Sequence, residues 1–162
     1  MKVLLALDGS TFAESAIPAT QRFAQTPDTE LHVITVVEPR WADTLVNLDG
    51  EGVAGIAWLR HQDEDAETAA GLPPDIERLV ARYLEDVSHR FSSCTVRPVL
   101  RVSPYPAEQI AAYAQAHDID IVVMATHGRS GFNRLLHGSV ASEVLRAGVA
   151  PVVLVRPNQQ GA

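Results

Sequence analysis

Short hydrophobic runs, separated by turn residues and helical patterns, limit the possible folds of this sequence more than any other feature. Each run is four to seven residues long, which suits a buried β-strand. Strands that alternate with helices form parallel sheets with helices on both faces. We therefore predict an α/β fold with a doubly wound, five-stranded parallel sheet, its strands at 2–7, 31–37, 96–102, 119–125 and 152–155.

Four helices are expected between these strands. Thr11 and Glu14 fit a capping box at the start of the first helix, and Pro18 lies inside its pattern and should bend the helix or loosen one turn. The clearest amphipathic pattern runs from Ile76 to Phe91. The remaining helices are expected over 106–117 and 139–147, with Gly148 ending the last one.

The length of 162 residues suits one domain, which we place at residues 1–156. Residues 40–74 form a long insert-like connection that carries two tryptophans and an acidic run. Connections of this length are uncommon and are often functional. Residues 157–162 are expected to be a disordered tail.

The composition excludes some classes of function. A net charge of −7 argues against a general binder of nucleic acid or of acidic membranes, because such proteins carry basic patches. Cys94 is the only cysteine, so neither an internal disulfide nor a cysteine-based metal site is possible. The apolar run that follows Met1 is too short for a signal peptide or a membrane span. We expect a cytoplasmic protein.

Two loops follow strands at positions where parallel sheets bind ligands. Asp8-Gly9-Ser10 follows the first strand, and a loop with two glycines, residues 125–131, follows the fourth. Downstream, Gly138 and Ser139 open a helix, which brings free N–H groups and a hydroxyl together. These features predict a phosphate-binding loop over 124–140. The alternative is that the glycines only shape a turn and that Ser139 only caps a helix.

Standard catalytic and phosphate motifs are absent from the sequence. Neither GxxxxGK[ST] nor GxGxxG occurs. His127 lies near Ser130, but no carboxylate partner is identifiable and GRSG is not a hydrolase elbow. The six histidines have no metal-ligand spacing. We therefore predict no catalytic residue and no protein-built metal site.

The loop and the last strand together resemble the universal stress protein family. Its signature is Gly, two residues, Gly, nine residues and Gly-Ser/Thr, and here Ala125 takes the place of the first glycine, followed by Gly128 and Gly138-Ser139. The closing segment 150–155 also fits, and the resemblance covers the chain apart from 40–74. It implies an adenine nucleotide alpha hydrolase-like sheet with strand order 3-2-1-4-5.

The resemblance also implies a nucleotide site. Asp8 would face the ribose or the adenine, and Ala6 and Val36 would line the adenine pocket. Ala125 would hinder binding only if its position requires a positive φ. ATP or AMP is the implied ligand, with Mg²⁺ on its phosphate oxygens. The residues that would hold the phosphates are Gly128, Arg129, Ser130, Gly138, Ser139 and Val140.

Three functions are therefore open. The first is an ATP- or AMP-binding regulator or ligand sensor in the stress response. The second is a nucleotide-free dimeric adaptor that binds protein partners, and the third is a slow ATP hydrolase. A homodimer is expected in each case, because Val152–Val155 would form an apolar sheet edge and the family commonly dimerises through this strand.

Overall fold

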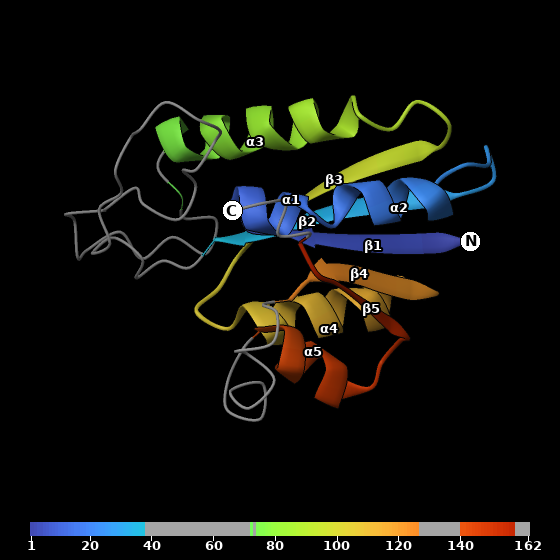
Figure 1. Ribbon diagram of the computed structural model, residues 1–162. Coiled ribbons are helices and arrows are strands. Elements are labelled where there is room, and N and C mark those ends of the chain that lie inside the picture. The colour runs from blue at the N-terminus through green and yellow to red at the C-terminus, as the bar shows by residue number, and fades with distance from the viewer. Residues whose placement is uncertain (38–71, 73, 127–139, 158–162) are drawn as a thin grey trace, which may run out of the picture.

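The computed structural model describes residues 1–37, 72, 74–126 and 140–157 (Figure 1). The predicted connection 40–74 and the predicted tail 157–162 therefore lie largely outside the described residues. Within them the five predicted strands are present. They are β1 (Lys2–Leu7), β2 (Glu30–Val37), β3 (Thr95–Val102), β4 (Ile121–Ala125) and β5 (Val152–Val155).

The five strands form one sheet in the order β3-β2-β1-β4-β5, and every pair is parallel. This confirms the predicted doubly wound α/β fold and its strand order. β1 lies at the centre, between β2 and β4. The chain builds outward from β1 to β2 and β3, and then returns to place β4 on the other side of β1.

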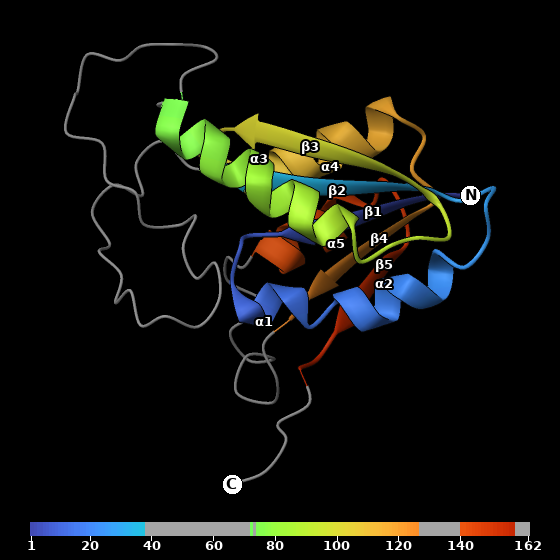
Figure 2. The same ribbon diagram turned by 90° about the horizontal axis from the view of Figure 1, so that it is seen from above.

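Helices cover both faces of the sheet, as Figure 2 shows from above. Three helices pack on one face, against a hydrophobic cluster that includes Leu5 and Val33: α1 (Thr11–Glu14), α2 (Ile17–Phe23) and α3 (Pro74–Ser88). Two helices pack on the opposite face, against a cluster that includes Leu4 and Ile34: α4 (Pro106–Ala116) and α5 (Val140–Ala147).

The first predicted helix is divided into two. Pro18 has no N–H with which to continue an α-helical ladder, so α1 ends at Glu14 and α2 begins at Ile17, with Pro18 in its first turn. The helix is thus fully interrupted, which goes beyond the predicted bend or loosened turn. The cap also differs from the prediction, because the Ala13 N–H donates to Ser10 Oγ at 3.1 Å, and Ser10 rather than Thr11 is the N-cap.

Other element ends differ from prediction by a few residues. α3 ends at Ser88, although Phe91 beyond it is still buried in the core. β4 begins at Ile121, because residues 117 and 118 form a turn after α4 and residue 120 forms a bend before the strand. β3 is a sheet edge, and most of its residues are exposed or half-buried. Gly148 follows α5 with φ +63°, the left-handed conformation typical of a helix end.

No helix among the residues that the structure describes is long and apolar enough to cross a membrane.

Candidate functional site

The carboxyl ends of β1 and β4 lie side by side at the centre of the sheet. From β1 the chain turns toward β2, and from β4 it turns the opposite way, toward β5. Open parallel sheets bind ligands where neighbouring connections diverge in this manner. Asp8 directly follows β1, and Ala125 is the last residue of β4. The structure therefore places the start of each of the two loops singled out by sequence at neighbouring strand ends.

Asp8 is held in place by the turn that starts α1. Its Oδ1 accepts the Ser10 N–H at 2.9 Å and the Ser10 hydroxyl at 2.6 Å. Gly9 between them has φ +82°, a conformation that glycine adopts without steric cost. The carboxylate is exposed at the edge of the sheet. Asp8 is thus a fixed acceptor, available to a ligand hydroxyl.

Ala6 and Val36 lie on the same face of the sheet. Both belong to the hydrophobic cluster beneath α4 and α5, and Val140, the first residue of α5, packs against the same cluster. Ala6 pairs with Ile34, so Val36 lies one step further toward the carboxyl edge on that face. Three of the predicted contact residues therefore share one apolar surface next to Asp8.

Ala125 has ordinary strand backbone. It pairs with Val155, and its side chain packs on the α1–α3 side of the sheet. Among the described residues, Asp118 is the only non-glycine residue with positive φ. The methyl group of Ala125 therefore meets no backbone strain at the position where the signature has glycine.

The predicted phosphate residues Gly128, Arg129, Ser130, Gly138 and Ser139 lie outside the described residues. The backbone on either side of them is described. The Thr126 N–H donates to the Val155 carbonyl at 2.8 Å, which extends the β4–β5 pairing by one residue, and α5 begins at Val140. The segment therefore leaves from the carboxyl edge of the sheet and returns to the start of a helix.

The turn after β3 is a feature of this edge that the sequence did not single out as a site. The Ser103 N–H donates to the Val37 carbonyl at 2.9 Å, and Ser103 Oγ accepts the Tyr105 N–H at 3.1 Å. Tyr105 is 62% exposed. The sequence could have indicated an exposed Tyr105, because a turn with a proline on each side of the aromatic residue leaves little room to bury the ring.

Two carboxylates, those of Glu14 and Asp8, lie close enough to Tyr83 to act on its hydroxyl. Burial raises the pKa of the Tyr83 hydroxyl, and the nearby charges of Glu14 and Asp8 raise it further. Tyr83 therefore stays protonated across the physiological range. No group of three or more potential metal ligands occurs in the described part of the chain.

A family model described as "Universal stress protein family" matches residues 1–156. The chain belongs to this family. The family predicted from the loop signature and the last strand is thereby confirmed, and the sheet order is that of the adenine nucleotide alpha hydrolase-like fold.

Individual relatives match along nearly the whole chain. Universal stress protein MJ0531 of Methanocaldococcus jannaschii is 26% identical over 155 residues, which cover 96% of this chain and 81% of the relative. A universal stress protein solved in complex with cAMP has a TM-score of 0.64 at 18% identity, covering 98% of both chains. Another, from Archaeoglobus fulgidus in complex with dAMP, has a TM-score of 0.60 at 15% identity and covers 95% of this chain and 96% of its own.

Proposed function

We propose that this protein is a stress-response regulator or ligand sensor that binds ATP or AMP at the carboxyl edge of β1 and β4. The observation that carries the proposal is the position of Asp8, a fixed and exposed carboxylate beside the apolar surface of Ala6 and Val36. Two relatives of the same fold hold cAMP and dAMP, which supports an adenine nucleotide as the ligand class. The predicted cytoplasmic location belongs to the same proposal.

In this proposal each part of the nucleotide meets a different chemistry. The adenine lies on Ala6, Val36 and Val140, and Asp8 accepts hydrogen bonds from the ribose hydroxyls. Mg²⁺ would accompany the nucleotide through phosphate oxygens, since no protein-built metal site is proposed. The phosphates are assigned to the backbone amides, hydroxyls and guanidinium of Gly128, Arg129, Ser130, Gly138 and Ser139.

The backbone of Ala125 bears on the alternative of a nucleotide-free adaptor. That alternative draws its support from alanine at a glycine position of the signature and from the acidic run in the connection 40–74. Ordinary strand backbone at Ala125 removes the conformational part of that argument. We assign no catalytic residue, so slow hydrolysis remains the least supported function.

The test is equilibrium binding of labelled ATP and AMP to purified protein stripped of nucleotide. Asp8→Ala removes an acceptor for the ribose, and hydrogen bonds to a charged group contribute about 1.5–3 kcal/mol, so affinity should fall roughly 10- to 100-fold. Asp28→Ala is the matched control, because Asp28 is an exposed carboxylate at the opposite end of the sheet, just before β2. If the protein binds no nucleotide at millimolar concentration, the proposal is wrong and the nucleotide-free adaptor is favoured. If Asp8→Ala and Asp28→Ala bind nucleotide with equal affinity, Asp8 does not contact the ribose.

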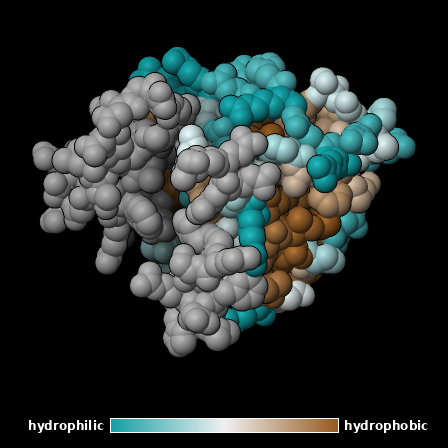
Figure 3. Space-filling model, viewed as in Figure 1, coloured by the Kyte–Doolittle hydropathy of each residue, from teal (hydrophilic) through white to brown (hydrophobic). Residues whose placement is uncertain are grey.

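We also propose a symmetric homodimer formed through β5. β5 is an edge strand, and all four of its residues are half-buried. The hydrophobic area that faces the viewer in Figure 3 lies where Figure 1 shows β4 and β5. Phe23, Ile121, Val153 and Val155 contribute partly buried side chains on this side of the sheet. A second copy of the chain would cover this edge and its apolar face.

A further inference from the structure

A buried histidine lies at the end of the sheet opposite the candidate site. His32, the third residue of β2, is 2% exposed and lies between Leu4 of β1 and Arg97 of β3 in the sheet register. Its side chain faces α4. A buried polar ring is costly unless its nitrogens are satisfied, and a buried imidazolium costs more.

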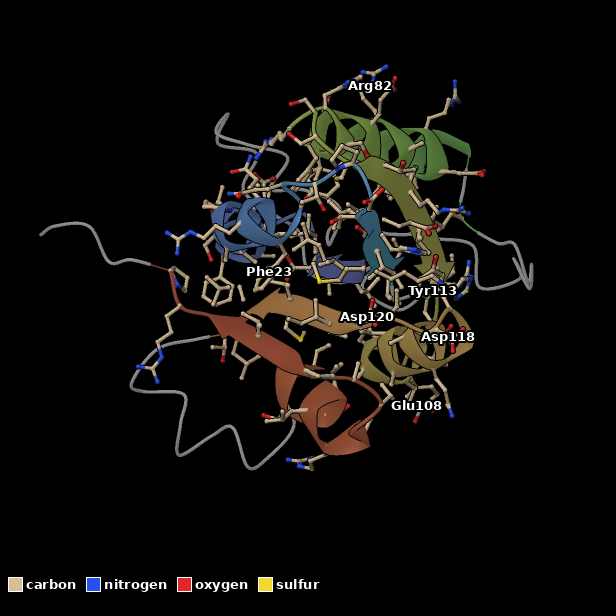
Figure 4. The ribbon with its side chains drawn as sticks, turned by 90° about the vertical axis from the view of Figure 1, so that its right-hand side faces the viewer. Phe23, Arg82, Glu108, Tyr113, Asp118 and Asp120 are labelled. Atoms are coloured by element: carbon tan, nitrogen blue, oxygen red, sulfur yellow. The ribbon has the colours of Figure 1, made fainter. Side chains whose placement is uncertain are left out.

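One ring nitrogen of His32 connects the sheet to α4. Nδ1 lies 2.7 Å from the hydroxyl oxygen of Tyr113. The Tyr113 ring in turn stacks on the His117 ring, with centroids 3.9 Å apart and planes 18° apart. The centroids of the His32 and His117 rings lie 5.9 Å apart, with their planes at 64°. Figure 4 shows Tyr113 where α4 faces the sheet. These three rings form the polar contact between β2 and α4.

The other ring nitrogen is not hydrogen-bonded. Nε2 lies 3.3 Å from Glu30 Oε1, but without the alignment of a hydrogen bond. We assign the neutral tautomer with its proton on Nε2, toward the Glu30 carboxylate. Nδ1 then accepts the Tyr113 hydroxyl proton, and a hydrogen bond in this direction requires an uncharged His32 ring.

The surrounding charges act on the His32 ring in both directions. Glu30 from β2 is the acidic group that faces His32, and it is already paired with Arg97 from β3. Lys2 from β1 donates to the His117 carbonyl at 2.8 Å, and Arg101 lies 5.4 Å from the centroid of Tyr113. Burial lowers the pKa of His32 most; Glu30 opposes this, while His117, Arg97 and Lys2 lower the pKa further.

We propose that His32 and Tyr113 form an acid-sensitive contact between β2 and α4, which opens when His32 takes up a proton. A proton from solvent would add an N–H at Nδ1, directed at the Tyr113 hydroxyl. The Tyr113 hydroxyl must then rotate to accept this N–H, and the hydroxyl proton loses Nδ1 as its acceptor. α4 packs beside α5 over the apolar face that contains Ala6 and Val36, so release of α4 loosens the layer behind the candidate site.

The direction of the pH effect follows from the lowered pKa. The unfolded chain binds a proton on this ring at about pH 6.5, and the folded chain does so only at lower pH. The contribution of the contact to stability is therefore complete above about pH 6.5 and is lost as the pH falls below it. The folding equilibrium changes by about tenfold for each pH unit that separates the two pKa values.

The experiment compares denaturant midpoints from about pH 7.5 to about pH 5, the range in which histidine titrates. His32→Leu combined with Tyr113→Phe replaces the contact with apolar groups and should lose part of the acid sensitivity seen in the wild-type protein. The control is His89→Gln, because His89 is 76% exposed, and it should match the wild type. The same pH dependence in all three proteins would overturn the proposal.

A second measurement decides the question if the double variant does not fold. In the wild-type protein, NMR titration of the histidine rings should give His32 a pKa below that of a free histidine. Hydrogen exchange of the α4 amides should accelerate as that ring protonates, before global unfolding. A His32 ring that titrates at or above about pH 6.5, or α4 exchange that is indifferent to its protonation, would contradict the proposal.

Discussion

At the scale of single residues, Ser10 has two tasks in one turn. Its hydroxyl donates to Asp8 and accepts the Ala13 N–H in the first turn of α1. The carboxylate that we assign to the ligand is therefore held by the same residue that caps the helix. The geometry of Asp8 and the stability of α1 should change together when Ser10 is altered.

Ser10→Ala should lower the free energy of unfolding by about 1 kcal/mol, the usual cost of a lost N-cap. It should also weaken nucleotide binding, because Asp8 loses its fixed orientation. Chemical denaturation and nucleotide titration of the same preparation measure the two effects. The control is Ser88→Ala in α3, where the hydroxyl donates only to the Leu84 carbonyl at 2.6 Å within its own helix. Equal stability of both variants would show that Ser10 is not the cap.

At the scale of elements, β5 differs from the other strands. β1 is paired on both sides and enclosed by helices on both faces, whereas β5 pairs only with β4 and remains half-buried. Natural sheets usually protect such an edge with charge, proline or a partner. The sequence VVLV supplies neither charge nor proline, which is why we assign it to a partner copy.

Val153→Lys should convert a dimer into a monomer, because a charge on the interface must be desolvated without a partner. Analytical ultracentrifugation measures the change, with circular dichroism to verify the fold. Leu145→Lys is the control on α5, where the side chain is 52% exposed. A wild-type protein that sediments as a monomer, or a Val153→Lys protein that remains dimeric, would contradict the assignment of the interface to β5.

At the scale of the whole molecule, one sheet separates two hydrophobic layers. Leu4 and Leu5 are adjacent in β1, both fully buried, and point to opposite layers. Because they share one strand, neither layer can lose its packing without disturbing the other. The two layers should therefore unfold in a single transition.

Leu4→Ala and Leu5→Ala should each lower the free energy of unfolding by about 2–5 kcal/mol, since each leaves a cavity in a packed layer. Thermal unfolding followed by tyrosine absorbance and by backbone circular dichroism should give coincident transitions in both variants. Separate transitions for the two probes would mean that the layers behave as independent units.

The sequence was sufficient for the architecture because the strand runs are apolar and sharply bounded, so β1 and β5 begin and end where predicted. The strand pattern predicted that Asp8 lies at the carboxyl edge of the sheet, whereas Ala6 and Val36 were assigned to the site only through the family resemblance. The division at Pro18 was harder to predict, because proline is tolerated in a helix's first turn and disruptive further in. The contact between His32 and Tyr113 joins residues 81 positions apart, which no local pattern reveals.

The central claim is that an adenine nucleotide binds at the carboxyl edge of β1 and β4. Addition of ATP to isotope-labelled, nucleotide-stripped protein, followed by amide NMR, tests it most directly. We expect the largest shifts at Asp8 to Ser10, at Val36 and Val37, at Thr126 and at Val140. Small shifts are expected at Lys2 and His32, at the opposite end of the sheet. Shifts centred on Lys2 and His32, or none at saturating ATP, would contradict the account.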